Sequence, residues 1–192
     1  MLRAEFIAGT TAMLLAQTSG TRPVAFDLRD SKMTVYVYKK GIFSFLADDH
    51  VIDAPIARGA YDAGAASVEV DVDAAALKVL DPKLSADKRS QVQTAMDGPK
   101  VLDVERYPKI SFRSTKIERN DRKLNIAGNL NLHGEMRPIV VTAEEADATH
   151  FSGSATIRLT DFGITPIKIA GGAVSVRDDV KIEFRVALAA GP

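Results

Sequence analysis

Apolar and polar residues alternate along most of this chain, and this two-residue period most constrains what the chain can fold into. In the stretch GNLNLHGEMRPIVV (128–141), Leu130 and Leu132 alternate with Asn129 and Asn131 before a His-Gly pair. Successive side chains of a β-strand point to opposite faces of a sheet, so the pattern predicts a strand with one buried face. The His-Gly pair then predicts a tight turn into a second strand.

The same period recurs from about residue 23 onwards, in runs that are separated by turn residues. We expect eight strands, close to residues 31–41, 42–52, 67–75, 109–118, 123–134, 137–144, 151–160 and 179–189. One-sided burial is typical of antiparallel sheets, because strands buried on both faces read as continuous apolar runs. About eight such strands can form a sandwich or a closed barrel, and a barrel of this size is either filled by side chains or holds one small ligand.

One segment, residues 81–103, loses the two-residue period and shows a helical one instead. Its helical stripe contains Leu84, Lys88, Val92 and Met96. Ser85 is a suitable cap for the start of a helix, and Gly98 is followed by a proline that cannot continue one. We therefore expect a short helix of about three turns, inserted between the early and the late strands.

Composition narrows the class of protein further. The chain has 192 residues, of which 46% are apolar, enough for one well-packed domain. The 25 basic and 25 acidic residues balance, whereas a nucleic-acid-binding protein usually shows a basic excess. The chain has no cysteine, which excludes disulfides, thiolate metal ligands and a cysteine nucleophile. We expect no nucleic-acid partner.

The N-terminal segment MLRAEFIAGTTAMLLAQTSG (1–20) is a candidate targeting sequence. Arg3 precedes a mildly apolar stretch (6–16) that is too short to span a bilayer, which is typical of a signal peptide. Glu5 and the two threonines at 10 and 11 weaken the pattern, and the alternative is an N-terminal helix packed on the domain. We expect a periplasmic or secreted protein, with a cytoplasmic one as the alternative, and no stable membrane insertion.

Four segments in the C-terminal half come in an order that is typical of one family. They are VLDVERYPKISFRSTKI (101–117), LNIAGNLNLHGEMRPIVV (124–141), FSGSATIRLTDFGI (151–164) and VRDDVKIEFRVAL (176–188). Together with SKMTVYVYKKGIFSFLADDHVIDAP (31–55), they resemble the YceI-like family over roughly residues 26–188.

The resemblance implies an all-β fold, a lipocalin-like antiparallel β-barrel of about eight strands with an elongated apolar interior. Residues 24–189 would form this YceI-like domain. Members of the family bind polyisoprenoid chains, such as isoprenoid quinones or prenyl diphosphates, and many are exported to the periplasm. The resemblance therefore implies non-enzymatic binding or transport of a long apolar amphiphile, without a cofactor and with a homodimer as a candidate assembly.

A hollow barrel needs apolar side chains that point inwards, and the two-residue period says which these are. The candidates for lining a ligand pocket are Val35, Val37, Val70, Ile110, Phe112, Leu130, Leu132, Ile157, Leu159, Phe184 and Val186. The alternative is a solid core, in which case the barrel is a ligand-free scaffold, for instance in a stress response. A long apolar chain gains about 0.8 kcal/mol for each CH₂ that it buries, so such a pocket needs no diagnostic polar motif.

The stretch LADDHVIDAP (46–55) supports a different reading, a small hydrolase-like enzyme. Here His50 lies among Asp48, Asp49 and Asp53, as a general base among carboxylates would. The sequence names no nucleophile, has no G-x-S-x-G motif, and lacks the histidine spacings of a metal site. We therefore expect His50 to be hydrogen-bonded to one of these acids, with no catalytic residue and no metal site.

Other candidates lie at the ends of the expected strands. In TDFGI (160–164), Gly163 would permit a bend and Phe162 would plug one end of the barrel. We expect His133 to face solvent or to pack beside Arg137. Four basic residues could surround the pocket mouth and attract a charged head group, or could be solvated surface charges: Lys39, Lys40, Arg137 and Lys168.

Overall fold

Long antiparallel strands make up most of the computed structural model, which describes residues 22–40, 49–169 and 174–190. The strands of seven or more residues are β2 (Lys32–Lys40), β4 (Ile56–Asp62), β5 (Ser67–Asp73), β7 (Lys109–Asn120), β8 (Lys123–Leu132), β9 (Glu135–Glu145), β10 (His150–Arg158) and β12 (Val174–Ala187). The described residues also form four short strands, β1 (Val24–Ala25), β3 (His50–Asp53), β6 (Lys78–Val79) and β11 (Lys168–Ile169). The predicted all-β, lipocalin-like fold is confirmed.

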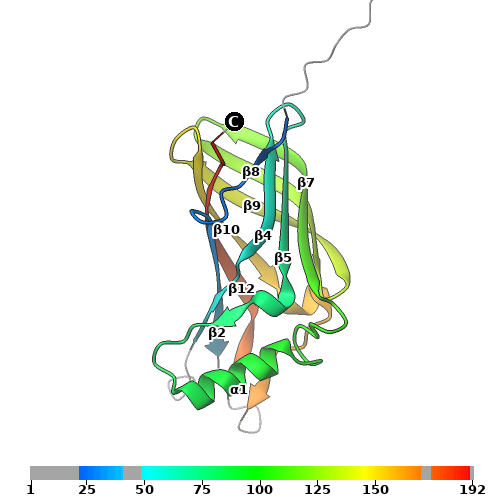
Figure 1. Cartoon of the computed structure of the whole chain (residues 1–192). Coiled ribbons are helices and arrows are strands. Elements are labelled where there is room, and N and C mark those ends of the chain that lie inside the picture. The colour runs from blue at the N-terminus through cyan, green and yellow to red at the C-terminus, as the bar shows by residue number, and fades with distance from the viewer. Residues whose placement is uncertain (1–21, 41–48, 170–173, 191–192) are drawn as a thin grey trace, which may run out of the picture.

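All the strands join into one sheet that curls around a central axis (Figure 1). Hydrogen-bonded neighbours follow the order β1-β4-β5-β7-β8-β9-β10-β12-β2-β3-β6, and β11 adds to β12. The chain around β1 brings the two sides of the sheet together, because β1 pairs with β4 while Phe26 bridges to Leu188 after β12. This closure leaves β1 no free edge at that end of the barrel.

Three irregularities in the ladder bend the long strands. The register shifts between β4 and β5 near Ile56, between β7 and β8 near Ser114, and between β12 and β2 after Val176. A bulge adds one residue to one strand, which bends it and increases its twist. These bulges therefore help the sheet to curl into a barrel instead of staying open.

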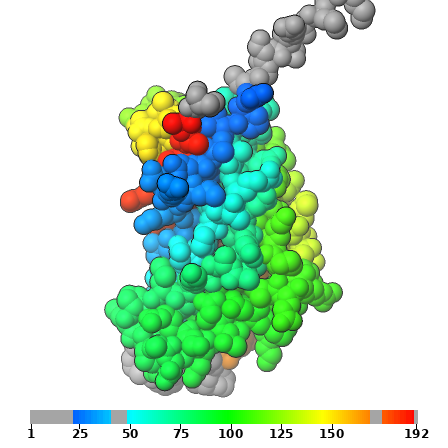
Figure 2. Space-filling view, viewed as in Figure 1, coloured from blue at the N-terminus to red at the C-terminus, as the bar shows by residue number. Residues whose placement is uncertain are grey.

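The inserted helix α1 (Ala86–Asp97) lies across one end of the barrel (Figure 1). The hydroxyl of Ser85 accepts a hydrogen bond from the backbone N–H of Lys88, as predicted for the helix start. In the space-filling view, the green segment that contains α1 and the loop after it covers the lower end of the molecule (Figure 2). We call this end the helix end and the opposite one, at the β4–β5 turn, the tyrosine end, after Tyr61.

The described residues also form two short 3₁₀ helices, η2 (Ala74–Ala76) and η3 (Leu159–Phe162). After η3, Gly163 has a φ of 71°, a left-handed conformation that glycine adopts without strain. Phe162 and Ile164 are the largest side chains that are fully buried. Gly163 thus permits the predicted bend, and Phe162 packs beneath it.

The early part of the chain differs from the prediction. Residues 41–48 lie outside the described residues, so only 49–52 of the expected strand 42–52 can be assessed, and residues 50–53 form β3. The structure adds β4, which we did not predict. Its bulge and Gly59 interrupt the two-residue period, and Gly59 leaves room for the ring of Phe26, whose Cδ2 lies 2.1 Å from where a Cβ would be.

In the described part of the chain, no helix is long and apolar enough to cross a membrane.

Candidate ligand-binding cavity

A cavity of about 830 Å³ runs through the barrel from the helix end to the tyrosine end. All eight long strands and α1 contribute to its wall, which is almost entirely apolar. Binding sites for small molecules usually enclose about 300–1,000 Å³ and are lined mainly by apolar side chains. The volume and the chemistry of this cavity therefore suit a ligand with a long apolar part.

The structure places every candidate pocket residue along this wall. They are Val35 and Val37 on β2, Val70 on β5, Ile110 and Phe112 on β7, Leu130 and Leu132 on β8, Ile157 on β10, Leu159 in η3, and Phe184 and Val186 on β12. The period of two was enough to select the ten that lie in strands, because each of them lies on the inner face of its strand. Whether they contact a ligand stays a prediction.

Two glycines help to keep the interior open. A Cβ on Gly128 would lie 2.5 Å from Phe112 Cζ, and one on Gly153 would lie 2.5 Å from Phe184 Cζ. Each ring therefore lies directly against the backbone of the neighbouring strand. A ring in this position covers the wall. It fills less of the interior than a ring that points across the barrel.

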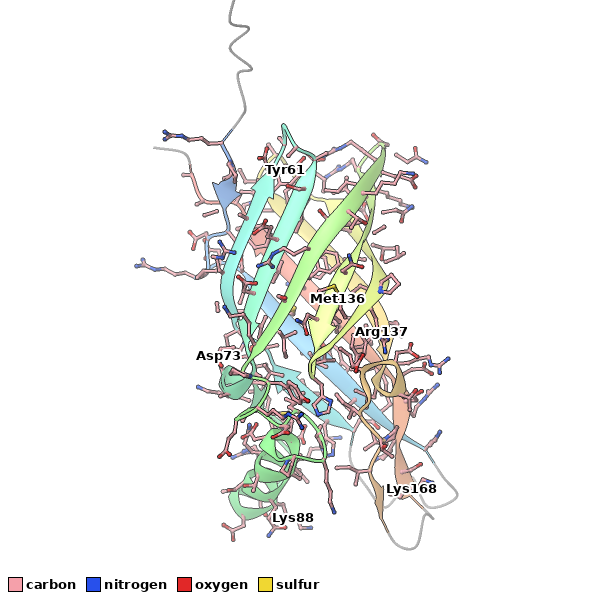
Figure 3. The ribbon with its side chains drawn as sticks, turned by 90° about the vertical axis from the view of Figure 1, so that its right-hand side faces the viewer. Tyr61, Asp73, Lys88, Met136, Arg137 and Lys168 are labelled. Atoms are coloured by element: carbon pink, nitrogen blue, oxygen red, sulfur yellow. The ribbon has the colours of Figure 1, made fainter. Side chains whose placement is uncertain are left out.

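The two ends of the cavity differ in chemistry. At the tyrosine end, the rings of Tyr61 and Phe151 lie 6.3 Å apart, and Arg119 is paired with Glu145. At the helix end, the lining includes Tyr38, Lys39, His50, Lys88, Gln91 and Thr165. Figure 3 shows Tyr61 at one end of the barrel and Lys88 at the other. Most polar groups of the cavity thus gather beside α1.

His50 has a partner that we did not predict. Its Nδ1 lies 2.6 Å from Oδ2 of Asp81, in the loop between β6 and α1, and its side chain forms no hydrogen bond with Asp49 or Asp53, while Asp48 lies outside the described residues. The other oxygen of Asp81 accepts a hydrogen bond of 2.7 Å from the backbone N–H of Val51. Asp81 was not among the predicted partners because β3 pairs with β6, which brings a residue 31 positions away beside His50.

Three of the four basic residues proposed for the mouth, Lys39, Lys40 and Lys168, lie together at the helix end, and Arg137 does not. Lys39 lines the main cavity, whereas Lys40 and Lys168 line a shallow depression of about 290 Å³ beside it. Arg137 lies on the outer surface with Glu135, 2.8 Å away (Figure 3). Arg137 therefore belongs to the surface charges.

His133 also differs from the expectation. It occupies a two-residue hairpin turn with Gly134, and both have positive φ, as a type I′ turn requires. Its ring packs on Tyr107 with centroids 4.6 Å apart, and Nδ1 lies 3.1 Å from the carbonyl oxygen of Phe162. His133 therefore ties the β8–β9 turn to η3 instead of facing solvent or Arg137.

Sequence reasoning missed part of the cavity wall. Lys88 and the apolar residues of the predicted helical stripe face the cavity, and the segment after Gly163 adds Ile164, Thr165, Pro166 and Ile167. The helical stripe was visible in the sequence, but nothing there said that the helix would close one end of a hollow barrel.

Among the described residues, no group of three or more His, Cys, Asp or Glu side chains could hold a metal ion.

These features define a class of protein, the hollow antiparallel β-barrel of lipocalin-like architecture. A family model described as the YceI-like domain matches residues 23–188. The chain therefore belongs to the YceI-like family, as its motifs indicated.

Relatives and solved structures agree with this assignment. A UPF0312 protein of Vibrio cholerae is 27% identical over 158 residues, which cover 77% of this chain and 75% of the relative. BcnA of Burkholderia cenocepacia has a TM-score of 0.59 at 22% identity, covering 86% of this chain and 99% of that one. A polyisoprenoid binding domain from Saccharophagus degradans has a TM-score of 0.60 at 12% identity, covering 87% and 98%. At these identities, the structural likeness shows the fold.

Proposed function

We propose that this protein binds or carries a long apolar amphiphile, a polyisoprenoid such as an isoprenoid quinone or a prenyl diphosphate, without covalent chemistry. The observation that carries the proposal is the continuous apolar cavity of about 830 Å³. The solved domain from Saccharophagus degradans is described as polyisoprenoid-binding, which supports the same ligand class. Each CH₂ that the ligand buries would contribute about 0.8 kcal/mol, so the apolar tail can supply most of the affinity.

The first test is mass spectrometry of an organic extract from natively purified protein. We expect one class of long-chain lipid in near-equal molar amount, and no lipid from a sample that was denatured, washed and refolded. An empty extract from a folded protein would be followed by addition of polyisoprenoids to the refolded sample. If none binds, the proposal is wrong and the scaffold alternative gains support.

A cavity-filling variant makes this test specific to the interior. Ala155 is buried and lines the cavity on β10, whereas its neighbour Thr156 is exposed on the outer face of the same strand. Ala155→Phe should lower the bound lipid at least about tenfold, because the ring occupies the space of the tail. Thr156→Phe adds the same ring outside the barrel and should leave the bound lipid unchanged.

The enzyme alternative has a separate test at His50. The pair that His50 forms with Asp81 resembles the base and its orienting acid in hydrolases. Replacing His50 by Ala should leave binding of the apolar tail intact if the protein is a carrier. Loss of turnover of a lipid ester in His50→Ala, with binding retained, would instead establish the enzyme.

We also propose that residues 1–20 direct export of the protein to the periplasm. The supporting feature is the basic residue followed by a short apolar stretch at the N-terminus. Mass spectrometry of the protein from periplasmic and cytoplasmic fractions would test this. We expect a shortened chain in the periplasmic fraction, and full-length protein in the cytoplasm alone would contradict it.

A further inference from the structure

Strands β9 and β10 lie next to each other in the barrel wall but pair along only part of their length. The ladder between them ends at Ser154 and Thr142. Both strands continue beyond this point, and each stays paired with its other neighbour, β9 with β8 and β10 with β12. Residues 135–141 of β9 and 155–158 of β10 therefore have a described strand partner on one side only. We call this stretch of the wall the lateral seam.

Backbone groups of β9 point towards the seam, where no described strand pairs with them. The two-residue turn before β9 fixes which residues bond to β8, and Met136, Pro138 and Val140 turn their backbone groups the other way. Pro138 has no N–H, and a proline inside a strand is tolerated where that strand has a free edge. The carbonyl oxygen of Met136 accepts a hydrogen bond of 3.0 Å from the guanidinium of Arg137 instead. No pair of the β9–β10 ladder therefore has to separate when the seam widens.

Charged side chains on the inner face of β9 reach water at the seam. The register places Glu135 opposite Leu132 and Arg137 opposite Leu130, and both leucines line the cavity. Paired residues of antiparallel strands share one face of the sheet. The side chains of Glu135 and Arg137 are nevertheless each 46% exposed, and they form an ion pair at 2.8 Å. From the inner face, these two side chains thus extend to the outer surface, which shows that the wall is open to solvent here.

The outer side of the seam is apolar. Met136 and Val140 are 59% and 58% exposed, whereas Asn131, which lies opposite Met136 on β8, is polar. On the inner face of the same strand, Ile139 and Val141 line the cavity. A lipid chain that crosses the seam therefore meets apolar side chains on both faces of β9, so its apolar surface is not fully exposed to water on the way.

Described groups cover both ends of the barrel. At the tyrosine end, Arg119 pairs with Glu145, and Arg122 donates a hydrogen bond of 2.8 Å to the carbonyl oxygen of Glu145. At the helix end, α1 and the loop after it lie over the opening, and Met96 of α1 is buried (Figure 2). Met136 lies on the side wall between these ends (Figure 3). Passage through an end would displace these groups, whereas the seam has no ladder to break.

We propose that the apolar chain of the ligand enters and leaves the cavity sideways, through the lateral seam, and not through an end of the barrel. This inference rests on the proposed function and adds the route by which the ligand exchanges. The seam is bounded by the ladder at Ser154 and Thr142 on one side and by the hydrogen bond between His133 and the carbonyl oxygen of Phe162 on the other. A chain that leaves sideways crosses the thickness of one sheet instead of sliding along the whole barrel.

A covalent bridge across the seam tests the route. The chain has no cysteine, so an introduced pair can be joined by a short bismaleimide without reaction elsewhere in the chain. In Val140→Cys/Thr156→Cys, both positions are exposed and would be partners if the ladder continued. The matched control, Glu144→Cys/Ser152→Cys, bridges two exposed positions that the ladder already pairs. Mass spectrometry confirms each bridge.

Stopped-flow fluorescence measures the rates on refolded, lipid-free protein with retinol, an isoprenoid alcohol whose fluorescence rises in apolar surroundings. The bridge across the seam should slow association and release alike, each at least about tenfold, and leave Kd within about twofold. A barrier on the route changes both rates without changing the bound state. The bridged control should keep both rates within about twofold of those of the natural protein.

A second variant tests the seam without a cross-link. Val140→Lys places an ammonium group where the apolar chain has to pass, and it should slow both rates at least about threefold at unchanged Kd. Ser152→Lys adds the same charge to the outer face of β10, where the ladder is closed, and should leave both rates unchanged.

The outcomes separate the route from the proposed function. Natural rates in both the bridged seam and Val140→Lys would overturn the seam and leave the carrier function standing, since retinol still binds. Equal slowing in the bridged seam and the bridged control would also overturn it, because the effect would then come from a general stiffening of the barrel. Failure of retinol to bind the natural protein, together with an empty lipid extract, would overturn both.

Discussion

At the scale of single residues, Asp81 is the most constrained polar group of the cavity region. Its side chain is 2% exposed, and its two oxygens are used by His50 and by the backbone N–H of Val51. A buried polar group that loses its partner costs about 1–3 kcal/mol. We expect Asp81→Asn to lower the free energy of unfolding by about that amount in urea denaturation, because an amide cannot accept through both of its ends.

The matched variant is Asp49→Asn, one residue before His50. Asp49 is exposed and accepts a hydrogen bond from the backbone N–H of Lys39. We expect this change to cost less than about 0.5 kcal/mol. Equal effects of the two substitutions would show that Asp81 does not organise this end of the barrel.

The arginine partners of Asp71 lead to a prediction about how stability depends on pH. Burial alone would raise the pKa of Asp71, but hydrogen bonds from Arg113, at 2.6 Å, and from Arg58, at 3.0 Å, outweigh it and lower the pKa. The folded state therefore favours the ionised form, and this contribution to stability is present above about pH 4 and is lost as the pH falls through the lowered pKa. Asp71→Asn should cost about 1 kcal/mol at pH 7 and much less at pH 3.

Urea unfolding of both proteins at the two pH values measures this difference. Glu69→Gln is the control, because Glu69 is half exposed and lies 3.3 and 3.5 Å from the same two arginines. Such a pair is worth less than about 1 kcal/mol. A cost of Asp71→Asn that does not change with pH would mean that packing, and not charge, explains it.

At the scale of elements, Gln93 attaches α1 to the barrel. Strand β6 is the last in the sheet, so its outer edge has no partner among the strands that the structure describes. The Gln93 side chain takes that place, since Oε1 accepts from Val79 N and Nε2 donates to Leu77 O, both at 2.9 Å. Gln93→Ala should lower stability by about 1–3 kcal/mol and speed hydrogen exchange in residues 77–79 and in α1.

Gln91 is the natural control for this change. It lies two positions earlier on α1 and is exposed, and its side chain forms no hydrogen bond with a described residue. Gln91→Ala should leave hydrogen exchange in 77–79 unchanged. If both variants exchange alike, the helix is held by its apolar contacts and not by the amide of Gln93.

The strands and the helix also show how much of the fold could be predicted from the sequence. The inner residues of β8 and β12 could be predicted, because their two-residue period is unbroken across Leu130 and Leu132 and again across Phe184 and Val186. Strand β4 could not, since its bulge and Gly59 remove the period. The cap at Ser85 located the start of α1, yet the role of Gln93 depends on β6, which is two residues long and has no signal of its own.

At the candidate site, the partner of His50 likewise could not be predicted from the sequence. Neighbours along the chain suggested Asp48, Asp49 or Asp53, whereas pairing of β3 with β6 selected Asp81. The alternation of inward and outward side chains along a strand is a local property, so the sequence alone could predict the cavity wall. Which loops meet at the end of a barrel depends on the whole topology, so the pairing of His50 with Asp81 could not be predicted from the sequence, although Lys39 at the same end was proposed.

At the scale of the whole molecule, the cavity links stability to ligand binding. A ligand that binds only the folded state stabilises it by RT ln(1 + [L]/Kd), about 2.7 kcal/mol when its concentration is 100 times Kd. Protein purified with its lipid should therefore unfold at a higher temperature than the same protein after denaturation and refolding without lipid. Equal midpoints for a lipid-loaded and a lipid-free sample would mean that the lipid does not bind the folded state more tightly than the unfolded state.

The length of the cavity sets the last prediction, which concerns the tail of the ligand. In a series of isoprenoid alcohols with two, three, four and nine units, each further CH₂ that enters the barrel adds up to about 0.8 kcal/mol to the binding free energy. Affinity should therefore rise steeply with the number of units while the tail still fits between the helix end and the tyrosine end. Once the cavity of about 830 Å³ is full, further units stay in water and the affinity should level off.

Competition against one bound fluorescent lipid measures the whole series on refolded protein. The Ala155→Phe variant shortens the space available to the tail, so its affinities should level off at fewer units than those of the natural protein. Thr156→Phe should follow the natural series. An affinity that does not depend on tail length would place the tail outside the barrel. A plateau that Ala155→Phe does not move would mean that the tail ends before it reaches β10, because only a tail that passes Ala155 meets the new ring.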